Sequence, residues 1–170
     1  MVVRIVEGYL LKRIRGDGME KYFEDFEVGS EMISPKRTVT EADITIFTGL
    51  SGDYNALHID EEFAKQTPYK TRVAQGLLSV SIVTGLQALM GHVNNTALGL
   101  LEINWVFKKG VVAGDTIFAK FIVREKRETS KQDRGILIRT VEVYNQHNEI
   151  VSEGVLTLLM KRIPQQTDLL

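Results

Sequence analysis

Residues 77–90 read Leu-Leu-Ser-Val-Ser-Ile-Val-Thr-Gly-Leu-Gln-Ala-Leu-Met. The run is apolar on most faces and longer than a typical strand, so it predicts a helix that is buried nearly all round. Gly76 stands where this helix would begin, and the free backbone N–H groups there carry a positive partial charge. A glycine lets a ligand oxygen approach the main chain closely. The start of the helix is therefore a candidate site for a carbonyl that gains negative charge.

After Gly91 the apolar pattern changes from the helical period to alternation. Leu101, Ile103, Trp105 and Phe107 alternate with polar residues, which predicts a strand with one buried face. Similar alternation follows in residues 117–123, 136–143 and 150–160, with turns at 114–115, 131–135 and 146–148. The pattern predicts four long strands in an antiparallel meander. Only the 77–90 helix is apolar enough to cover such a sheet, so we expect an α+β domain whose antiparallel sheet wraps around a buried central helix.

The composition is that of one ordinary globular domain. The chain has 170 residues, 44% hydrophobic and 25% charged, with a formal net charge of -1. Without a long basic block, nucleic acid is not the default partner. The opening residues 1–11 are too short and charged for a membrane span and lack the apolar core of a signal peptide, so we expect no membrane partner.

The chain contains no cysteine, which excludes disulfides, thiolate metal sites and a cysteine nucleophile. Three histidines form no pattern of metal ligands, so we expect neither a metal nor a cofactor. The absence of disulfides fits a reducing compartment, and we expect the protein to be cytoplasmic.

The predicted domain spans residues 19–162, between an N-terminal extension, 1–18, and a C-terminal tail, 163–170. The extension has two interpretations: a start codon assigned upstream of the true one, or a short strand that pairs with the edge of the domain. An exposed edge strand is commonly covered by pairing two subunits. We therefore expect a homodimer or a dimer of dimers.

The segment Leu50–His58 carries the best functional clue. Asp53 and His58 lie five positions apart in a turn-rich connection, after a predicted helix from Thr40 to Leu50 and before a short helix that Asp60 would cap. A carboxylate and a neutral imidazole within reach of one water can hold it and move its proton. Taken alone, Asp53 is more often a turn residue and His58 a satisfied imidazole.

These residues belong to a longer motif, Phe47-x-x-x-Ser51-Gly52-Asp53-x-Asn55-x-Leu57-His58-x-x-x-x-x-Ala64, followed by Val73–Leu77 and by Phe107-x-x-x-Val111-x-x-Gly114-Asp115. The motif resembles the signature of the MaoC-like, (R)-specific enoyl-CoA hydratase family, which has the hot-dog fold. The resemblance covers roughly residues 23–160. Ala56 and Gln75 depart from it, where the family usually has proline and histidine.

The resemblance implies a mechanism. Asp53 and His58 would activate one water for addition across a trans-2-enoyl thioester, or run the reverse dehydration. Asn55 would orient the pair, and the Gly76 N–H would bind the thioester oxygen. A coenzyme A thioester would be the substrate rather than a cofactor. Two alternatives remain open: a thioesterase in which Asp53 activates water for attack on the thioester carbonyl, and a non-catalytic module that binds acyl thioesters.

Other polar residues have two interpretations each. Thr84 and Gln87 could line an acyl tunnel, although Thr84 could equally bond its own helix backbone. Lys108 and Lys109 could meet a phosphate of the carrier, but solvated ends of a strand explain them better. His92 is expected to be a cation favoured by the helix dipole.

Overall fold

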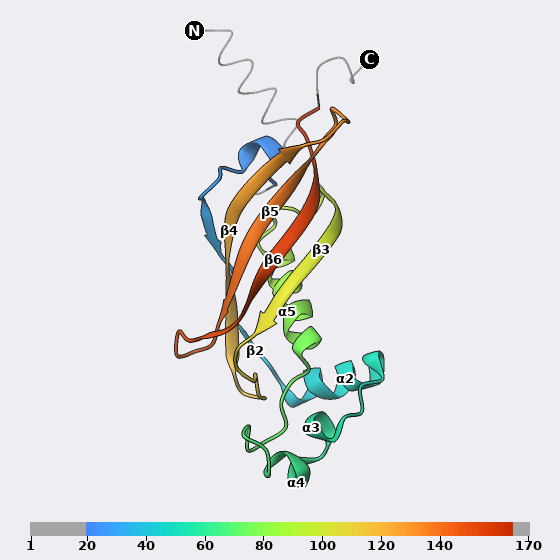
Figure 1. The fold of residues 1–170 in the computed structure, drawn as a ribbon, viewed down its shortest axis with the longest axis vertical. Helices are drawn as coiled ribbons and strands as arrows, with labels where there is room; N and C mark the ends of the chain where they lie inside the picture. Colours follow the sequence, from blue (N-terminus) through green and yellow to red (C-terminus); the bar gives the residue numbers. More distant parts are fainter. Residues whose placement is uncertain (1–19, 165–170) are drawn as a thin grey trace.

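The computed structural model describes residues 20–164, so the predicted 1–18 extension and residues 165–170 of the predicted tail lie outside it. Four long antiparallel strands curve around one helix, and three short helices gather at one end of the sheet (Figure 1). The elements in chain order are η1 (Phe23–Asp25), β1 (Glu31–Ile33), β2 (Arg37–Thr38), α2 (Glu41–Ser51), α3 (Ala56–Ile59), α4 (Glu61–Ala64), α5 (Gly76–Leu89), β3 (Ala97–Phe107), β4 (Thr116–Glu128), β5 (Arg134–Tyr144) and β6 (Ile150–Lys161).

The sheet runs in the order β1-β4-β5-β6-β3, and β2 also pairs with β4. Strands β4, β5 and β6 form the predicted meander. The first of the four long strands departs from that prediction, because β3 pairs with β6 and not with β4, which follows it in the chain. Alternation of apolar residues locates a strand and its buried face, but it does not say which partner the strand takes.

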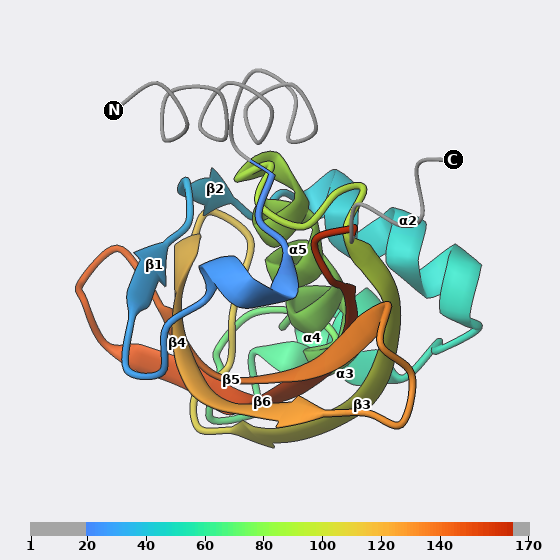
Figure 2. The ribbon, with the colours of Figure 1, turned by 90° about the horizontal axis from the view of Figure 1, so that it is seen from above.

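The concave face of the sheet packs against α5, and the sheet half encloses the helix when seen from above (Figure 2). The main core joins Leu78, Ile82 and Leu86 of α5 to the inner face of the sheet, including Phe121 and Val141. Burying each of these side chains contributes roughly 1.5–3 kcal/mol. The predicted hot-dog architecture, a sheet wrapped around a central helix, is confirmed.

The apolar run of residues 77–90 predicts a helix that is buried nearly all round, but one side of α5 is exposed. A stripe along it faces outward, with Leu77 and Leu89 at its ends, 67% and 69% exposed. The stripe passes over Ser81 and Gly85, which are also exposed. Within residues 20–164, no layer covers this side of α5.

Strand β3 corrects a second prediction of burial. Leu101, Ile103 and Phe107 were predicted to be buried, but they are 53%, 47% and 50% exposed. Leu100, which was not part of that prediction, is 45% exposed, although Leu100 and Ile103 share the inner face with Leu158 and Leu156, their partners on β6. A register shift between Leu100 and Glu102 puts Leu101 out of phase with the predicted alternation. The strand lies at the edge of the sheet, beside the outward stripe of α5, so Leu100 and Ile103 are only partly covered, although Trp105 on the same face packs against the core.

Local signals around α2 behave as predicted. The Thr40 hydroxyl accepts from the Asp43 N–H at 3.2 Å, and the Asp43 carboxylate accepts from the Thr40 N–H at 2.8 Å, which closes a capping box. Gly52 ends the helix in the left-handed conformation, with φ at 74°. Ile44 is buried as expected, whereas Ile46 is 69% exposed.

Pro35 separates two short strands, β1 and β2, which both pair with β4. None of the helices in the described part of the chain is long and apolar enough to cross a membrane.

Candidate active site

Asp53 and His58 come together beside the start of α5. The His58 Nε2 and the Asp53 Oδ2 lie 3.5 Å apart, and the side chains are 11% and 48% exposed. The imidazole is therefore largely enclosed, while the carboxylate keeps contact with solvent. The two residues predicted to act as a pair are neighbours in space.

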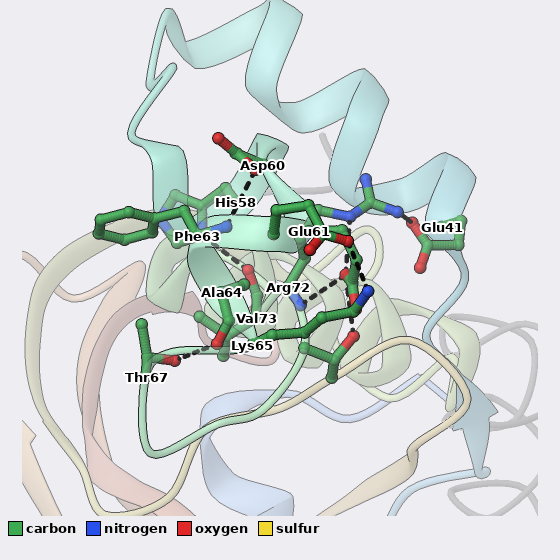
Figure 3. A network of polar contacts seen from close by, with 12 residues as sticks. Glu41, His58, Asp60, Glu61, Phe63, Ala64, Lys65, Thr67, Arg72 and Val73 are labelled. Carbon is green, nitrogen blue, oxygen red and sulfur yellow. Dashed lines mark hydrogen bonds and ion pairs between the residues drawn. The ribbon is translucent and has the colours of Figure 1, made fainter.

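A second contact fixes the tautomer of His58. Its Nδ1 lies 2.6 Å from the carbonyl oxygen of Val73 (Figure 3). A carbonyl only accepts hydrogen bonds, so Nδ1 carries the proton, and in the neutral ring Nε2 holds a lone pair. That lone pair and the Asp53 carboxylate are then two acceptors facing one place. A water or a substrate hydroxyl there could give a proton to either.

The backbone around the pair explains why it holds its place. The Val73 N–H donates to the Leu57 carbonyl at 3.2 Å, so Val73 forms hydrogen bonds with α3 through both its N–H and its C=O. The Asn55 side chain caps α3 by accepting from the Leu57 N–H at 3.0 Å. The Asn55 N–H lies 3.3 Å from the Asp53 Oδ1, which leaves Oδ2 for His58. Asn55 thus positions both members through the loop rather than through a contact with the imidazole.

Arg72 ties together the short helices that surround α3. Its guanidinium donates to Glu41 of α2 at 2.6 Å and to Glu61 of α4 at 3.4 Å (Figure 3). The Arg72 N–H also donates to Glu61, and this bond, the largest of the favourable contributions, lowers the pKa of that carboxyl. Arg72 directly precedes Val73, so the ion pairs anchor the segment that holds His58.

Gly76 begins α5 as predicted, and its neighbour Gln75 supplies no side-chain cap to the helix. The first N–H groups of the helix therefore have no intrahelical partner. The Gln75 side chain is buried and donates to the Thr48 hydroxyl at 2.7 Å, which fixes the start of α5 against α2. A Cβ at Gly76 would lie 2.8 Å from the Phe107 ring, so the close packing of β3 also requires glycine here.

A cavity of about 450 Å³ opens at this point. His58, Gly76 and Phe107 line it, together with the base of Lys108 and Lys109. Both lysines have acidic partners on β6 or the turn before it, at 2.7 Å each: Lys108 with Glu153 and Lys109 with Glu149. The cavity brings the imidazole and the start of the helix to the same space, which is what an addition next to a thioester requires.

Thr84 does not reach this cavity. Its hydroxyl donates to the Ser81 carbonyl of its own helix at 2.8 Å, the simpler of its two interpretations. Together with Gln87 it lines a second cavity of about 240 Å³ further along α5. Thr84 therefore belongs to the other end of the helix.

Two interactions of the site could not be read from residue types. The Val73 carbonyl acts through its backbone, and a backbone contact leaves no side-chain signal. Phe107 looked like one member of an alternating strand, and only the fold brings it over Gly76. Residues 20–164 contain no cluster of three or more histidine, aspartate or glutamate side chains able to hold a metal ion.

Comparison with known proteins gives consistent results. The model of the MaoC-like domain family matches residues 25–145. An (R)-specific enoyl-CoA hydratase of Rhodospirillum rubrum is 38% identical over 104 residues, 60% of this chain and 69% of that protein. An (R)-specific enoyl-CoA hydratase of Aeromonas caviae is 31% identical over 133 residues, 77% of this chain and 92% of that protein. A crystal structure described as a monoamine oxidase regulatory protein from Archaeoglobus fulgius superimposes with a TM-score of 0.79 at 33% identity, covering 85% of this chain and 97% of that one.

Proposed function

Because this chain belongs to the MaoC-like dehydratase family, we propose that it is a hydro-lyase that interconverts a trans-2-enoyl thioester and an (R)-3-hydroxyacyl thioester. The observation that carries the proposal is the orientation of His58. Its Nδ1 is engaged by the Val73 carbonyl, and its Nε2 faces the Asp53 carboxylate at 3.5 Å. Binding alone would not require two proton acceptors around one point.

In the hydration direction, Asp53 and His58 hold one water between them. As the water oxygen bonds to the β-carbon, the pair removes one of its protons. The π electrons shift toward the thioester, and the α-carbon then takes up a proton from the same pair. The β-carbon gains a hydroxyl and the α-carbon gains a hydrogen, so one water is added across the double bond, and the enzyme ends in the protonation state in which it began. Dehydration is the same path reversed.

The start of α5 stabilises the charge that develops on the thioester oxygen. The Gly76 N–H lacks an intrahelical partner and lies at the positive end of the helix dipole. It borders the same cavity as His58. A donor fixed before the reaction can contribute several kcal/mol to such a step. The substrate is the coenzyme A thioester itself, and the proposed reaction uses no cofactor.

The exposed apolar surface of β3 and α5 leads us to propose a homodimer. Strand β3 is an unpaired edge, and it carries half-exposed Leu100, Ile103 and Phe107 beside the outward stripe of α5. A second copy that packs there would cover both. Sizing with light scattering should give at least twice the 19.2 kDa of the chain, and Ile103→Lys should shift it toward the monomer. A monomeric wild type at micromolar concentration would contradict this.

The reaction is tested with crotonyl-CoA. Loss of the enoyl absorbance without release of thiol, with formation of (R)-3-hydroxybutyryl-CoA, is the expected result. Release of thiol would instead favour the thioesterase, in which the water attacks the carbonyl carbon. Binding of the thioester with neither change, across a range of chain lengths, would favour the non-catalytic module.

A further inference from the structure

A charged side chain that the proposed mechanism does not use lies inside the domain. Arg139 projects from β5 toward α5 and is fully buried, with an exposed fraction of 0%. Its guanidinium stacks over the Phe121 ring, 5.1 Å from the centroid, and its Nη2 donates to the Gln87 Oε1. The Arg139 Nε has no hydrogen-bond partner among the residues that the structure describes.

No carboxylate within residues 20–164 forms an ion pair with Arg139. Burial alone lowers the pKa of the guanidinium to about 10, so it remains protonated at neutral pH. A buried charge without a counter-ion is unfavourable, and proteins normally pair such groups. Arg139 is therefore a cation whose counter-ion could be supplied by an anionic group of a ligand.

A cavity lies beside Gln87, the hydrogen-bond partner of this cation, although Arg139 itself does not line the cavity. It measures about 240 Å³ and is lined by Thr84, Gln87, Leu98, Leu100, Leu156 and Leu158, among others. Arg139 is the cross-strand partner of Leu156 and the hydrogen-bond partner of Gln87. Gln87 and Leu156, which line the cavity, are therefore neighbours of Arg139.

The polar end of the cavity offers donors only. Arg139 cannot accept a hydrogen bond, so it fixes the Gln87 amide with its oxygen toward the guanidinium. The Gln87 Nε2 group is then left as a donor, and no described residue accepts from it. The rest of the wall consists of four leucines with Ala97 and Gly99, and the Thr84 hydroxyl donates to its own helix. The cavity thus suits a methylene chain that ends in an acceptor.

This cavity and the candidate active site lie along one seam between α5 and β3. Gly76 and Phe107 mark one end of the seam, and Gln87 and Leu100 mark the other. Gln87 is eleven residues after Gly76, so it lies about 16 Å further along the helix axis. An acyl chain whose carbonyl is bound at Gly76 can place its far end at Gln87.

We propose that the acyl group of the substrate ends in a carboxylate, which the Gln87 amide receives, with the Arg139 guanidinium behind that amide. This inference rests on the proposed function, because that function places the thioester at Gly76. A carboxylate would accept from the Gln87 Nε2 group, and its negative charge would offset the buried positive charge of Arg139 behind it. A chain that ends in a methyl group would leave both unsatisfied, and we expect at least about tenfold discrimination against it.

The test compares pairs of trans-2-enoyl-CoA thioesters of equal length, one ending in methyl and one in carboxylate, over a series of lengths. The wild type should prefer the carboxylate at the length that reaches Gln87, and Arg139→Met should lose that preference. Arg139→Lys should retain part of it. Arg127→Met, which removes an exposed arginine of β4, is the matched control and should behave as wild type.

Gln87→Glu is a second, independent variant. It would supply Arg139 with an internal anion and repel a ligand carboxylate, so it should invert the preference even if Arg139→Met failed to fold. Thermal unfolding identifies the variants that fold. We expect Arg139→Met to be among them, because replacing an unpaired buried ion by an apolar side chain is often neutral or stabilising.

Calorimetric binding of the saturated thioesters separates the two proposals. A carboxylate preference in binding without any hydration would overturn the proposed reaction and leave this inference standing. Equal binding and equal turnover of both members of each pair, unchanged in Arg139→Met and Gln87→Glu, would overturn the inference and leave the reaction standing.

Discussion

The two ends of helix α5 treat polar groups in opposite ways. At its start, Asp53 is half exposed, and His58 is enclosed but bonded to a backbone carbonyl. At its far end, Gln87 of α5 and Arg139 of β5 are buried between the helix and the sheet and hydrogen-bond to each other. The first end has spare proton acceptors, and the second has spare donors. One helix can therefore hold the reacting end of a substrate and select its distal end.

The energetics of the two ends differ accordingly. Groups at the start of α5 keep solvent or main-chain partners, so the fold loses little by placing them there. The desolvation of Arg139 is not offset by any described carboxylate. Substitutions at the first end should mainly reduce turnover, whereas substitutions at the second should mainly change which substrate is turned over.

The largest effect is expected at Asp53 and His58. Asp53→Asn and His58→Gln each remove one of the two acceptors that hold the water, and turnover should fall by roughly two to four orders of magnitude. The chain should remain folded, because neither side chain belongs to the core. Steady-state kinetics with thermal unfolding measure both quantities.

Asp133→Asn and His147→Gln are the matched controls for that comparison. Asp133 pairs with its neighbour Arg134, and His147 lies in an exposed turn, both remote from the cavity in the chain and absent from its lining. They should keep wild-type turnover. Near-normal turnover in Asp53→Asn or His58→Gln would remove that residue from its assigned role.

A smaller loss, on the order of tenfold or more, is expected for Gly76→Ala. The added Cβ would lie 2.8 Å from the Phe107 ring, so the ring must move within the cavity. Phe107→Ala alone measures the contribution of the ring, and the double variant should recover part of the activity lost in Gly76→Ala. A double variant no better than Gly76→Ala would place the obstruction at the thioester itself.

Most of the fold could be predicted from its apolar periodicity. The helix at 77–90, the alternating strands and the capping residues Thr40 and Asp60 each depend on local signals, and each lies where local chemistry puts it. The position of β3 could not be predicted, since pairing partners are not encoded in alternation. The exposure of Leu101, Ile103 and Phe107 was missed for a related reason: an apolar face predicts burial, but not whether its own chain or another supplies the cover.

The candidate site divides in the same way. Asp53, His58 and Gly76 form a spaced motif of polar and turn residues, which is visible in the sequence. Arg139 also stood on the face of β5 shared by Leu137 and Val141, and the structure buries that face. The alternation therefore indicates that Arg139 is buried. Its lack of a counter-ion and the cavity beside its partner Gln87 are known only from the structure.

Asn55→Ala tests whether the loop holds the catalytic end in place. Losing the cap of α3 should cost about 1 kcal/mol of stability, and turnover should fall by about tenfold or less. Asn55→Ser retains a capping oxygen and should lie near the wild type in both measurements. If Asn55→Ala lost as much turnover as Asp53→Asn, Asn55 would take part in the reaction directly.

The smallest effect concerns His92, just beyond the end of α5. It was predicted to be a cation favoured by the helix dipole, and the structure contradicts this. Burial lowers the pKa of its imidazole, and the nearby cations Lys21 and Arg139 lower it further. Its Nδ1 is buried without a partner among the described residues. The neutral form is therefore the one that the fold accommodates.

The sign of the pH effect follows from that shift. Below the ordinary pKa of 6.5 the unfolded chain binds a proton at His92 that the folded chain resists, until the lower pKa of the folded state is reached. The free energy of unfolding should thus fall as the pH drops through this window, and less so in His92→Gln. By NMR titration, the pKa of His92 should lie below the ordinary value of 6.5, and Arg139→Met should raise this pKa by removing one cation. A pKa of His92 that stayed the same in Arg139→Met would contradict the electrostatic coupling between these two groups.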